Sequence, residues 1–195
     1  MPPTPALSPD QALHAVLQTS RLNGWSVAVF AGLCTLATLP LGDLVGTFVG
    51  LVAVTSGMME VRGNRRLRRR DAGGMKWLVR AQLMLLGVIL AYAVSRLASF
   101  DAGYLKEEVI PEARQNLLLF GINLDDLLRE GGMTLDDLVG FARLACWAFY
   151  GAVILATCLY QGGLALYYRR RTPLVAHALA APPSLPIPPP IAPIS

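Results

Sequence analysis

The sequence predicts an all-α membrane protein whose four transmembrane helices form two antiparallel hairpins. Of its 195 residues, 54% are hydrophobic and only 15% are charged, whereas an average soluble domain carries about 25% charged residues. The charges also gather in short blocks and leave long apolar runs between them. One basic block, residues 60–76, has such a run on either side. These observations together predict a chain that crosses a bilayer several times.

The first 21 residues are expected to form a segment apart from the spans. Ser8 followed by Pro9 is typical of a helix start, because serine caps the first turn and proline fits its first position. Apolar residues then recur on one helical face, at Ala12, Leu13, Val16 and Leu17. This pattern predicts a short amphipathic helix on the membrane surface, with Arg21 and Trp25 as its anchors.

Four apolar runs, at about residues 22–39, 44–59, 75–97 and 138–168, are the predicted spans of a transmembrane domain over residues 22–171. The turn signal Pro-Leu-Gly-Asp at 40–43 is too tight to hold a domain, so the first two spans pair as an antiparallel hairpin. A cleaved signal peptide is the alternative interpretation of the first run, although its leader of roughly 20 residues makes a poor match.

Residues 100–137, between the third and fourth spans, form a polar and acidic loop that still has a helical pattern. Asn123 and Thr134 are typical helix-capping residues, and each is followed by paired aspartates within a Leu-Asp-Asp-Leu sequence. We interpret these pairs as helix-start chemistry rather than calcium ligands, because the alternating oxygen ligands of a calcium loop are missing.

The cations predict the orientation. Those of the basic loop, residues 60–74, and of residues 169–171 flank span ends and are expected in the cytoplasm, with the acidic loop outside and both termini inside. We expect the inner membrane of a bacterium. The proline-rich tail, residues 172–195, is expected to be disordered, with docking into an aromatic groove of a partner as the alternative.

Glycines four residues apart mark one face of the second span, at Gly42, Gly46 and Gly50. Such spacing lets a neighbouring helix approach closely, which matters in lipid because burial of apolar surface does not drive helices together there. We expect this face to pack against another helix of the same chain, and a seam between copies in a homo-oligomer is the alternative.

Charges at matching depths predict contacts between spans. Asp43, Arg96 and Arg143 fall near the outer membrane boundary, where a charge is costly unless it is paired or reaches the headgroups. We therefore expect either a pair between Asp43 and an arginine or arginines that reach outward, and an ion or substrate gate is a third alternative. Glu60 and Arg80 are expected to meet at the inner boundary.

Two further polar contacts are predicted. Gln82 and Gln161 lie on the third and fourth spans at depths that favour a hydrogen bond between them. Four arginines of the basic loop share one helical face and are expected to contact anionic lipid headgroups, with a pure topology signal as the alternative; they are Arg62, Arg65, Arg66 and Arg69. A nucleic-acid partner is not expected, because this cluster lies between two spans.

The sequence carries no motif typical of a catalytic, cofactor or metal site. The three cysteines, Cys34, Cys146 and Cys158, lie in apolar runs, and His14 and His177 have no ligand at metal spacing. We therefore expect a non-enzymatic scaffold or accessory subunit that binds the bilayer and a membrane protein partner. An oligomeric channel or transporter is the alternative, with Thr55, Tyr92 and Thr157 as its weak midplane candidates.

Overall fold

The computed structural model describes residues 8–181, and within them the chain is helical with no β-strand. In chain order the elements are α1 (Pro9–Thr38), α2 (Leu44–Arg68), α3 (Gly74–Ala98), α4 (Ala102–Tyr104), the π-helix η1 (Leu105–Val109), α5 (Ile110–Leu119), α6 (Leu124–Glu130), α7 (Leu135–Thr157), the π-helix η2 (Cys158–Gly162) and α8 (Gly163–Ala180). Three helices of the described part are long and apolar enough to cross a membrane: α2, α3 and the continuous helix Leu135–Ala180. They indicate an integral membrane protein.

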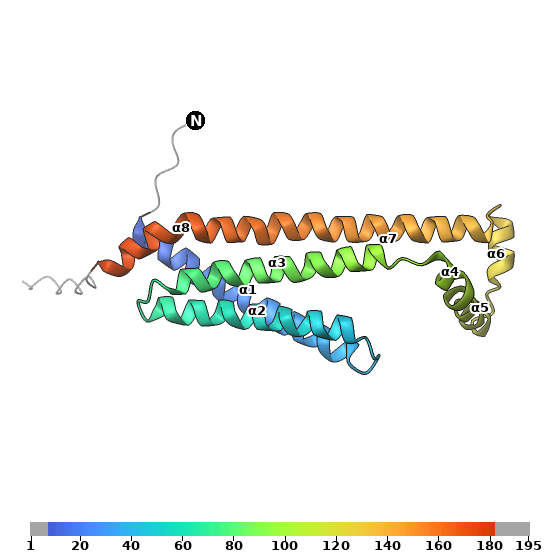
Figure 1. The fold of residues 1–195 in the computed structure, drawn as a ribbon, viewed down its shortest axis with the longest axis horizontal. Coiled ribbons are helices and arrows are strands. Elements are labelled where there is room, and N and C mark those ends of the chain that lie inside the picture. Colours follow the sequence, from blue (N-terminus) through green and yellow to red (C-terminus); the bar gives the residue numbers. More distant parts are fainter. Residues whose placement is uncertain (1–7, 182–195) are drawn as a thin grey trace, which may run out of the picture.

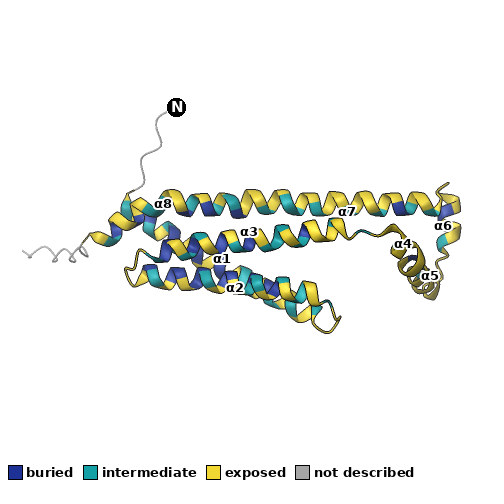
Figure 2. Cartoon of the chain, viewed as in Figure 1, coloured by how far each residue is buried: buried dark blue, intermediate teal, exposed yellow. Residues whose placement is uncertain are grey.

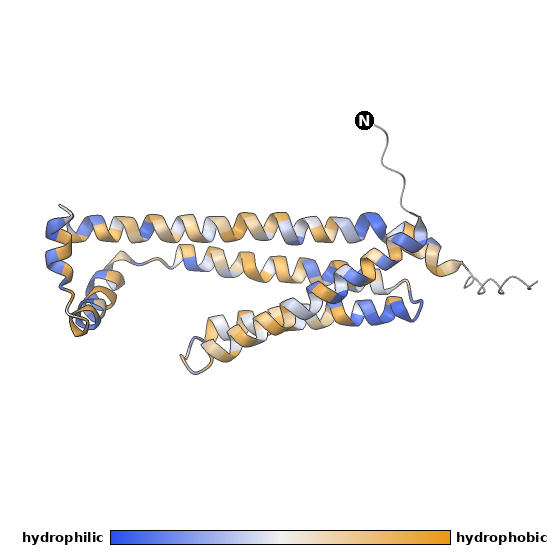
Figure 3. Cartoon of the chain, turned by 180° about the vertical axis from the view of Figure 1, so that it is seen from behind, coloured by the Kyte–Doolittle hydropathy of each residue, from blue (hydrophilic) through white to orange (hydrophobic). Residues whose placement is uncertain are grey.

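The long helices lie side by side (Figure 1). α1 packs along α2, α2 packs against α3, and α3 contacts both α7 and α8, while α8 also reaches α1. The short helices α4 to α6 lie beyond the end of α3, next to the start of α7. We call the end that holds α8 and the turn 69–73 the basic end, because the arginines of residues 62–70 and 169–171 belong to it. Figure 3 shows hydrophilic residues gathered there.

The larger of the two core clusters in the described residues lies at the basic end. The buried side chains Val16, Leu67, Met75, Leu78, Tyr168 and Val175 form one cluster there, contributed by α1, α2, α3 and α8. Figure 2 shows the buried residues concentrated in this region, whereas α7 is exposed along most of its length. Buried apolar side chains therefore hold the helices together mainly at this end.

The expected separate surface helix within residues 1–21 is instead the first part of the long helix α1. It runs for 30 residues without a break, from a capping box in which Ser8 Oγ accepts from the Gln11 amide. Its first half buries Ala12, Val16 and Ser20 completely, in contact with α8 and the core. The apolar face that resembled a membrane anchor therefore meets protein. Residues 1–7 lie outside the described part.

The tail was expected to begin at residue 172, but α8 extends past this position. The helix continues through Pro173 to Ala180, and its last turns bury Val175 and Ala178. Proline removes one backbone hydrogen bond and bends a helix, and the end of α8 does turn away from the line of the preceding helix (Figure 1). Burial against α1 compensates for this loss. The tail prediction for residues 182–195 falls outside the described residues.

The acidic loop contains short helices at the predicted starts. Asn123 caps α6 by accepting from the amide of Asp125 at 3.0 Å, and Thr134 forms a capping box with Asp137 at the start of α7. Arg114 pairs with Asp125 at 2.7 Å, and Lys106 pairs with Asp136. The paired aspartates thus serve helix starts and ion pairs.

The three glycines expected to form one packing face, Gly42, Gly46 and Gly50, have different surroundings. Gly42 lies in the turn before α2 with φ +69° and nothing near its Cβ position, and Gly46 lies against the carboxylate of Asp43, which caps its own helix. Gly46 also faces α1, since a Cβ there would lie 3.4 Å from Thr38 Cγ2, and Gly50 meets α1 at Thr35. The expected contact with another helix of the chain therefore holds at Gly46 and Gly50, whereas Gly42 serves the turn.

The closest contacts with the backbone of a neighbouring helix occur at other glycines. A Cβ at Gly57 would lie 2.8 Å from both the Ala28 nitrogen and the Gly24 carbonyl oxygen of α1. A Cβ at Gly74 of α3 would lie 2.6 Å from the Gly63 carbonyl oxygen of α2. These positions let backbones touch, which stabilises helix pairs in lipid through van der Waals contact.

We predict that Gly57→Ala destabilises the protein by about 1–3 kcal/mol, because the added methyl group forces α1 away from α2. Gly87→Ala is the matched control: Gly87 lies within α3 and has nothing within 4 Å of its Cβ position. Thermal unfolding of both variants in detergent, followed by loss of the monodisperse elution peak, measures the difference. Equal melting temperatures would contradict the close α1–α2 contact.

Candidate functional site: a buried polar cluster beside a basic groove

A carboxylate is buried where α1, α2 and α8 meet. Glu60 of α2 is 1% exposed, and its two oxygens accept hydrogen bonds from Asn23 Nδ2 at 2.6 Å and from the Tyr168 hydroxyl at 2.7 Å. The Tyr160 hydroxyl donates to Asn23 Oδ1 at 3.0 Å. We call these four side chains the polar cluster. It joins α1, α2, η2 and α8 through side chains alone.

A second set of bonds lies one turn nearer the basic end. Asn64 Nδ2 donates to the Leu17 carbonyl at 2.6 Å and to Ser20 Oγ at 2.7 Å, while Arg68 Nε donates to Asn64 Oδ1 at 3.0 Å. Glu60 and Asn64 are four residues apart and therefore face the same way on α2. Together they hold the first half of α1 in register against α2.

Two glutamines complete the polar interior. Gln82 of α3 is 1% exposed and its side chain approaches Glu60, whereas Gln161 of η2 borders an otherwise largely apolar cavity of about 350 Å³ between α1, α2 and α3. The predicted bond between Gln82 and Gln161 is not formed, since the Oε1 atom of each has no partner among the described residues. Each amide instead faces a different part of the interior.

The expected contact between Glu60 and Arg80 is corrected as well. Arg80 is exposed on α3, and the Glu60 carboxylate points the other way, toward α1 and α8. The position of a residue along a span predicts its depth, but it does not specify which face of the helix the residue occupies.

The π-helix η2 lies beside the polar cluster. A π-turn adds a residue to the helical repeat and is often found at functional sites. Here η2 spans Cys158–Gly162 and carries both Tyr160, which donates to Asn23, and Gln161, which is buried. No pattern among these residues had predicted this irregularity.

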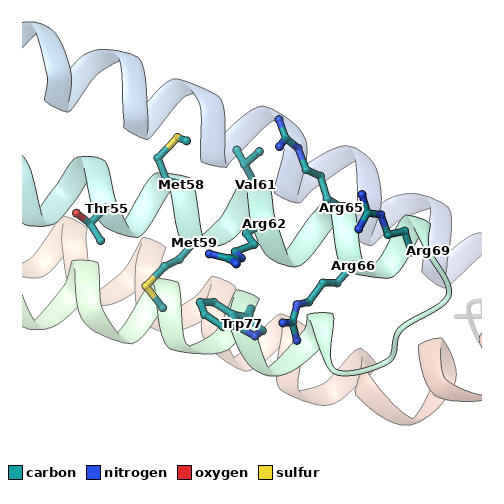
Figure 4. A pocket seen from close by; sticks show the side chains of 9 residues that line it. All are labelled: Thr55, Met58, Met59, Val61, Arg62, Arg65, Arg66, Arg69 and Trp77. Carbon is teal, nitrogen blue, oxygen red and sulfur yellow. The ribbon is translucent and has the colours of Figure 1, made fainter.

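A basic groove opens on the other side of α2 (Figure 4). It has a volume of about 550 Å³, and its lining contains the four arginines of the predicted lipid-contact face together with Trp77 of α3. The guanidinium groups of Arg62 and Arg66 lie 5.6 Å and 5.3 Å from the Trp77 ring centroid, within the range of cation–π attraction. The structure therefore brings Arg62, Arg65, Arg66 and Arg69 to one concave surface.

At the opposite end of the bundle, Asp43 lies beside Arg96. Its Oδ2 is 3.2 Å from Arg96 Nη2, while its Oδ1 accepts from the Gly46 amide at 2.9 Å. Arg96 also donates through Nε to the Tyr92 hydroxyl at 3.1 Å. Arg143 forms no ion pair within residues 8–181, so of the two arginines considered only Arg96 reaches Asp43. Both partners are partly exposed, and such pairs contribute about 0–1 kcal/mol.

The side chains that carry chemistry do not converge on a metal centre: no three His, Cys, Asp or Glu side chains approach one another within residues 8–181. Cys34, Cys146 and Cys158 are free thiols. The all-helical fold and its three long apolar helices indicate an integral membrane protein. The chain matches no protein-family model, and neither a curated protein nor a solved structure is significantly similar to it.

We predict that Tyr168→Phe destabilises the protein by about 1–3 kcal/mol, because it leaves a buried carboxylate oxygen of Glu60 without its donor. Tyr167→Phe is the matched control. Its hydroxyl has no hydrogen bond to the described residues, and its ring contact with Arg171, at 5.4 Å, is retained in phenylalanine. Thermal unfolding in one detergent compares the two variants. Equal losses of stability would contradict the role assigned to the Glu60–Tyr168 bond.

Proposed function

We propose that this chain is a non-enzymatic membrane scaffold or accessory subunit that presents its last long helix to a membrane protein partner. In this proposal four segments cross the bilayer, the second half of α1 being the first of them. The basic end lies in the cytoplasm and α4 to α6 lie outside.

The observation that carries this proposal is the exposure of α7. In the most apolar stretch of Leu135–Ala180, only 6% of the residues are buried. Among the other long helices, α7 packs against α3 alone. Large apolar side chains face outward along it, among them Phe141, Leu144, Trp147 and Phe149. Lipid covers such a surface without cost, but a helix with one neighbour also leaves most of its circumference open to a second protein.

The arm formed by α4 to α6 supports the same function. Leu119 and Phe120, where α5 ends, are 83% and 81% exposed, and Leu118, Ile122 and Leu127 are exposed beside them. Outside a bilayer, exposed large apolar side chains close together in the sequence favour an interaction site. The carboxylates around it favour a partner with complementary positive charge.

Exposed apolar side chains also support α1 as a span. Phe30, Leu33 and Leu36 are each more than 60% exposed, and residues 22–38 continue the same helix that packs along α2. The arginines at the basic end support the orientation, because cations near span ends favour the cytoplasmic side.

A channel or transporter formed by several copies is the second candidate. The polar cluster favours it, because a carboxylate inside a membrane protein often belongs to an ion or proton path. The weak midplane candidates give it less support. The Thr55 hydroxyl donates to the Leu51 carbonyl of its own helix, and the Tyr92 hydroxyl accepts from Arg96, so each already has a partner on its own helix.

The test is a photo-crosslinking amino acid at Leu144 of α7, with Leu83 of α3 as the matched control, since both side chains are exposed. We expect irradiation of intact cells to join Leu144 to one protein of defined mass and Leu83 to lipid only. An adduct whose mass is a whole multiple of this 21.0 kDa chain would favour the channel. The absence of any protein adduct at Leu144 would contradict the scaffold.

A further inference from the structure

The basic groove changes character along its length. Its inner part is lined by Thr55, Met58 and Met59, and its outer part by the arginines from residue 62 to residue 69 (Figure 4). At 1.5 Å per residue, Thr55 and Arg69 are about 21 Å apart along α2. The groove therefore runs from the apolar part of a membrane-crossing helix to its charged end.

The positive charge of the groove is largely uncompensated. Arg66 is 3.6 Å from Asp71, through an ion pair that is about half exposed. Arg62, Arg65 and Arg69 have no carboxylate within ion-pair distance in the described part of the chain. Trp77 holds the guanidinium groups of Arg62 and Arg66 near its ring, which fixes two donors on one side of the groove. Guanidinium groups bind phosphate oxygens in a bidentate manner.

We propose that this groove binds one anionic phospholipid. Its phosphate lies among Arg62, Arg65 and Arg66, and an acyl chain follows Met58 and Met59 toward Thr55. A soluble phosphate would use only the outer part, whereas a phospholipid matches both the cationic and the apolar part. Tryptophan favours the depth at which headgroup meets acyl chain. The proposal depends on α2 and α3 crossing the membrane, and it is independent of the scaffold function.

The probe is Trp77 itself. In a full-length variant carrying W25F and W147F, two positions that are about half exposed, Trp77 is the only tryptophan. This protein is reconstituted into phosphatidylcholine nanodiscs that contain increasing fractions of phosphatidylglycerol brominated on its acyl chains. We expect saturable quenching of Trp77 at low fractions, and no such saturation with brominated phosphatidylcholine.

Two double variants distinguish a specific lipid site in the groove from diffuse electrostatic attraction of anionic lipid. R62Q/R65Q removes two charges from the groove, and we expect the fraction of brominated lipid needed for half-quenching to rise about 25-fold, about fivefold for each arginine. R169Q/R170Q removes two exposed charges from α8 at the same end of the bundle, outside the groove. We expect it to leave the quenching curve unchanged.

Equal shifts in the two double variants would overturn the proposal in favour of diffuse attraction to an anionic surface. Relief of quenching by soluble glycerol phosphate would overturn it in favour of a phosphate site without a lipid preference. If R62Q/R65Q fails to fold, the comparison of the two brominated lipids on the otherwise unaltered protein still decides, because equal quenching by both would exclude a selective site.

Discussion

The hydrogen-bonded burial of Glu60 is the constraint on which the arrangement of the helices depends. A carboxylate away from water is costly unless its oxygens have donors. Asn23 and Tyr168 supply those donors from the first and last long helices, at separations of 37 and 108 residues. The ends of the described chain are thereby brought to the same place, and α3 closes the core beside them.

The close helix contacts and the polar cluster are parts of one interface. Gly24 follows Asn23 on α1, and Gly57 precedes Glu60 on α2 by one turn. Because the missing side chains bring α1 and α2 into backbone contact, the short side chain of Asn23 reaches across to Glu60. Larger residues at these glycines would separate donor from acceptor. Small residues and polar residues thus support each other here.

Much of the fold follows from local sequence signals. Apolar runs bounded by charges indicated the helices α2, α3 and α7 to α8, and capping residues indicated where α6 and α7 begin. The face of each helix was harder to predict. Arg80 and Arg96 were both assigned to a depth, yet only Arg96 meets a carboxylate, because the rotation of a helix is set by packing between distant segments.

The candidate site was predicted in part. The arginines of the basic groove share a helical face that can be read from their spacing, but Trp77 comes from the next helix and joins them only after α2 and α3 pack. Asn23, Asn64, Tyr160 and Tyr168 were missed, although polar residues four apart on α2 and an asparagine within α1 were visible signals. The continuation of α8 past Pro173 was missed because its burial depends on α1.

The pairing of α8 with α1 has a consequence for biosynthesis. A ribosome releases Glu60 more than a hundred residues before Tyr168, so the membrane insertion machinery receives α1 to α3 while this acid still lacks one of its donors. Until the last helix arrives, the nascent chain exposes a carboxylate where the mature protein has none. A chain that stops short of α8 permanently lacks the donor that Tyr168 supplies to this carboxylate.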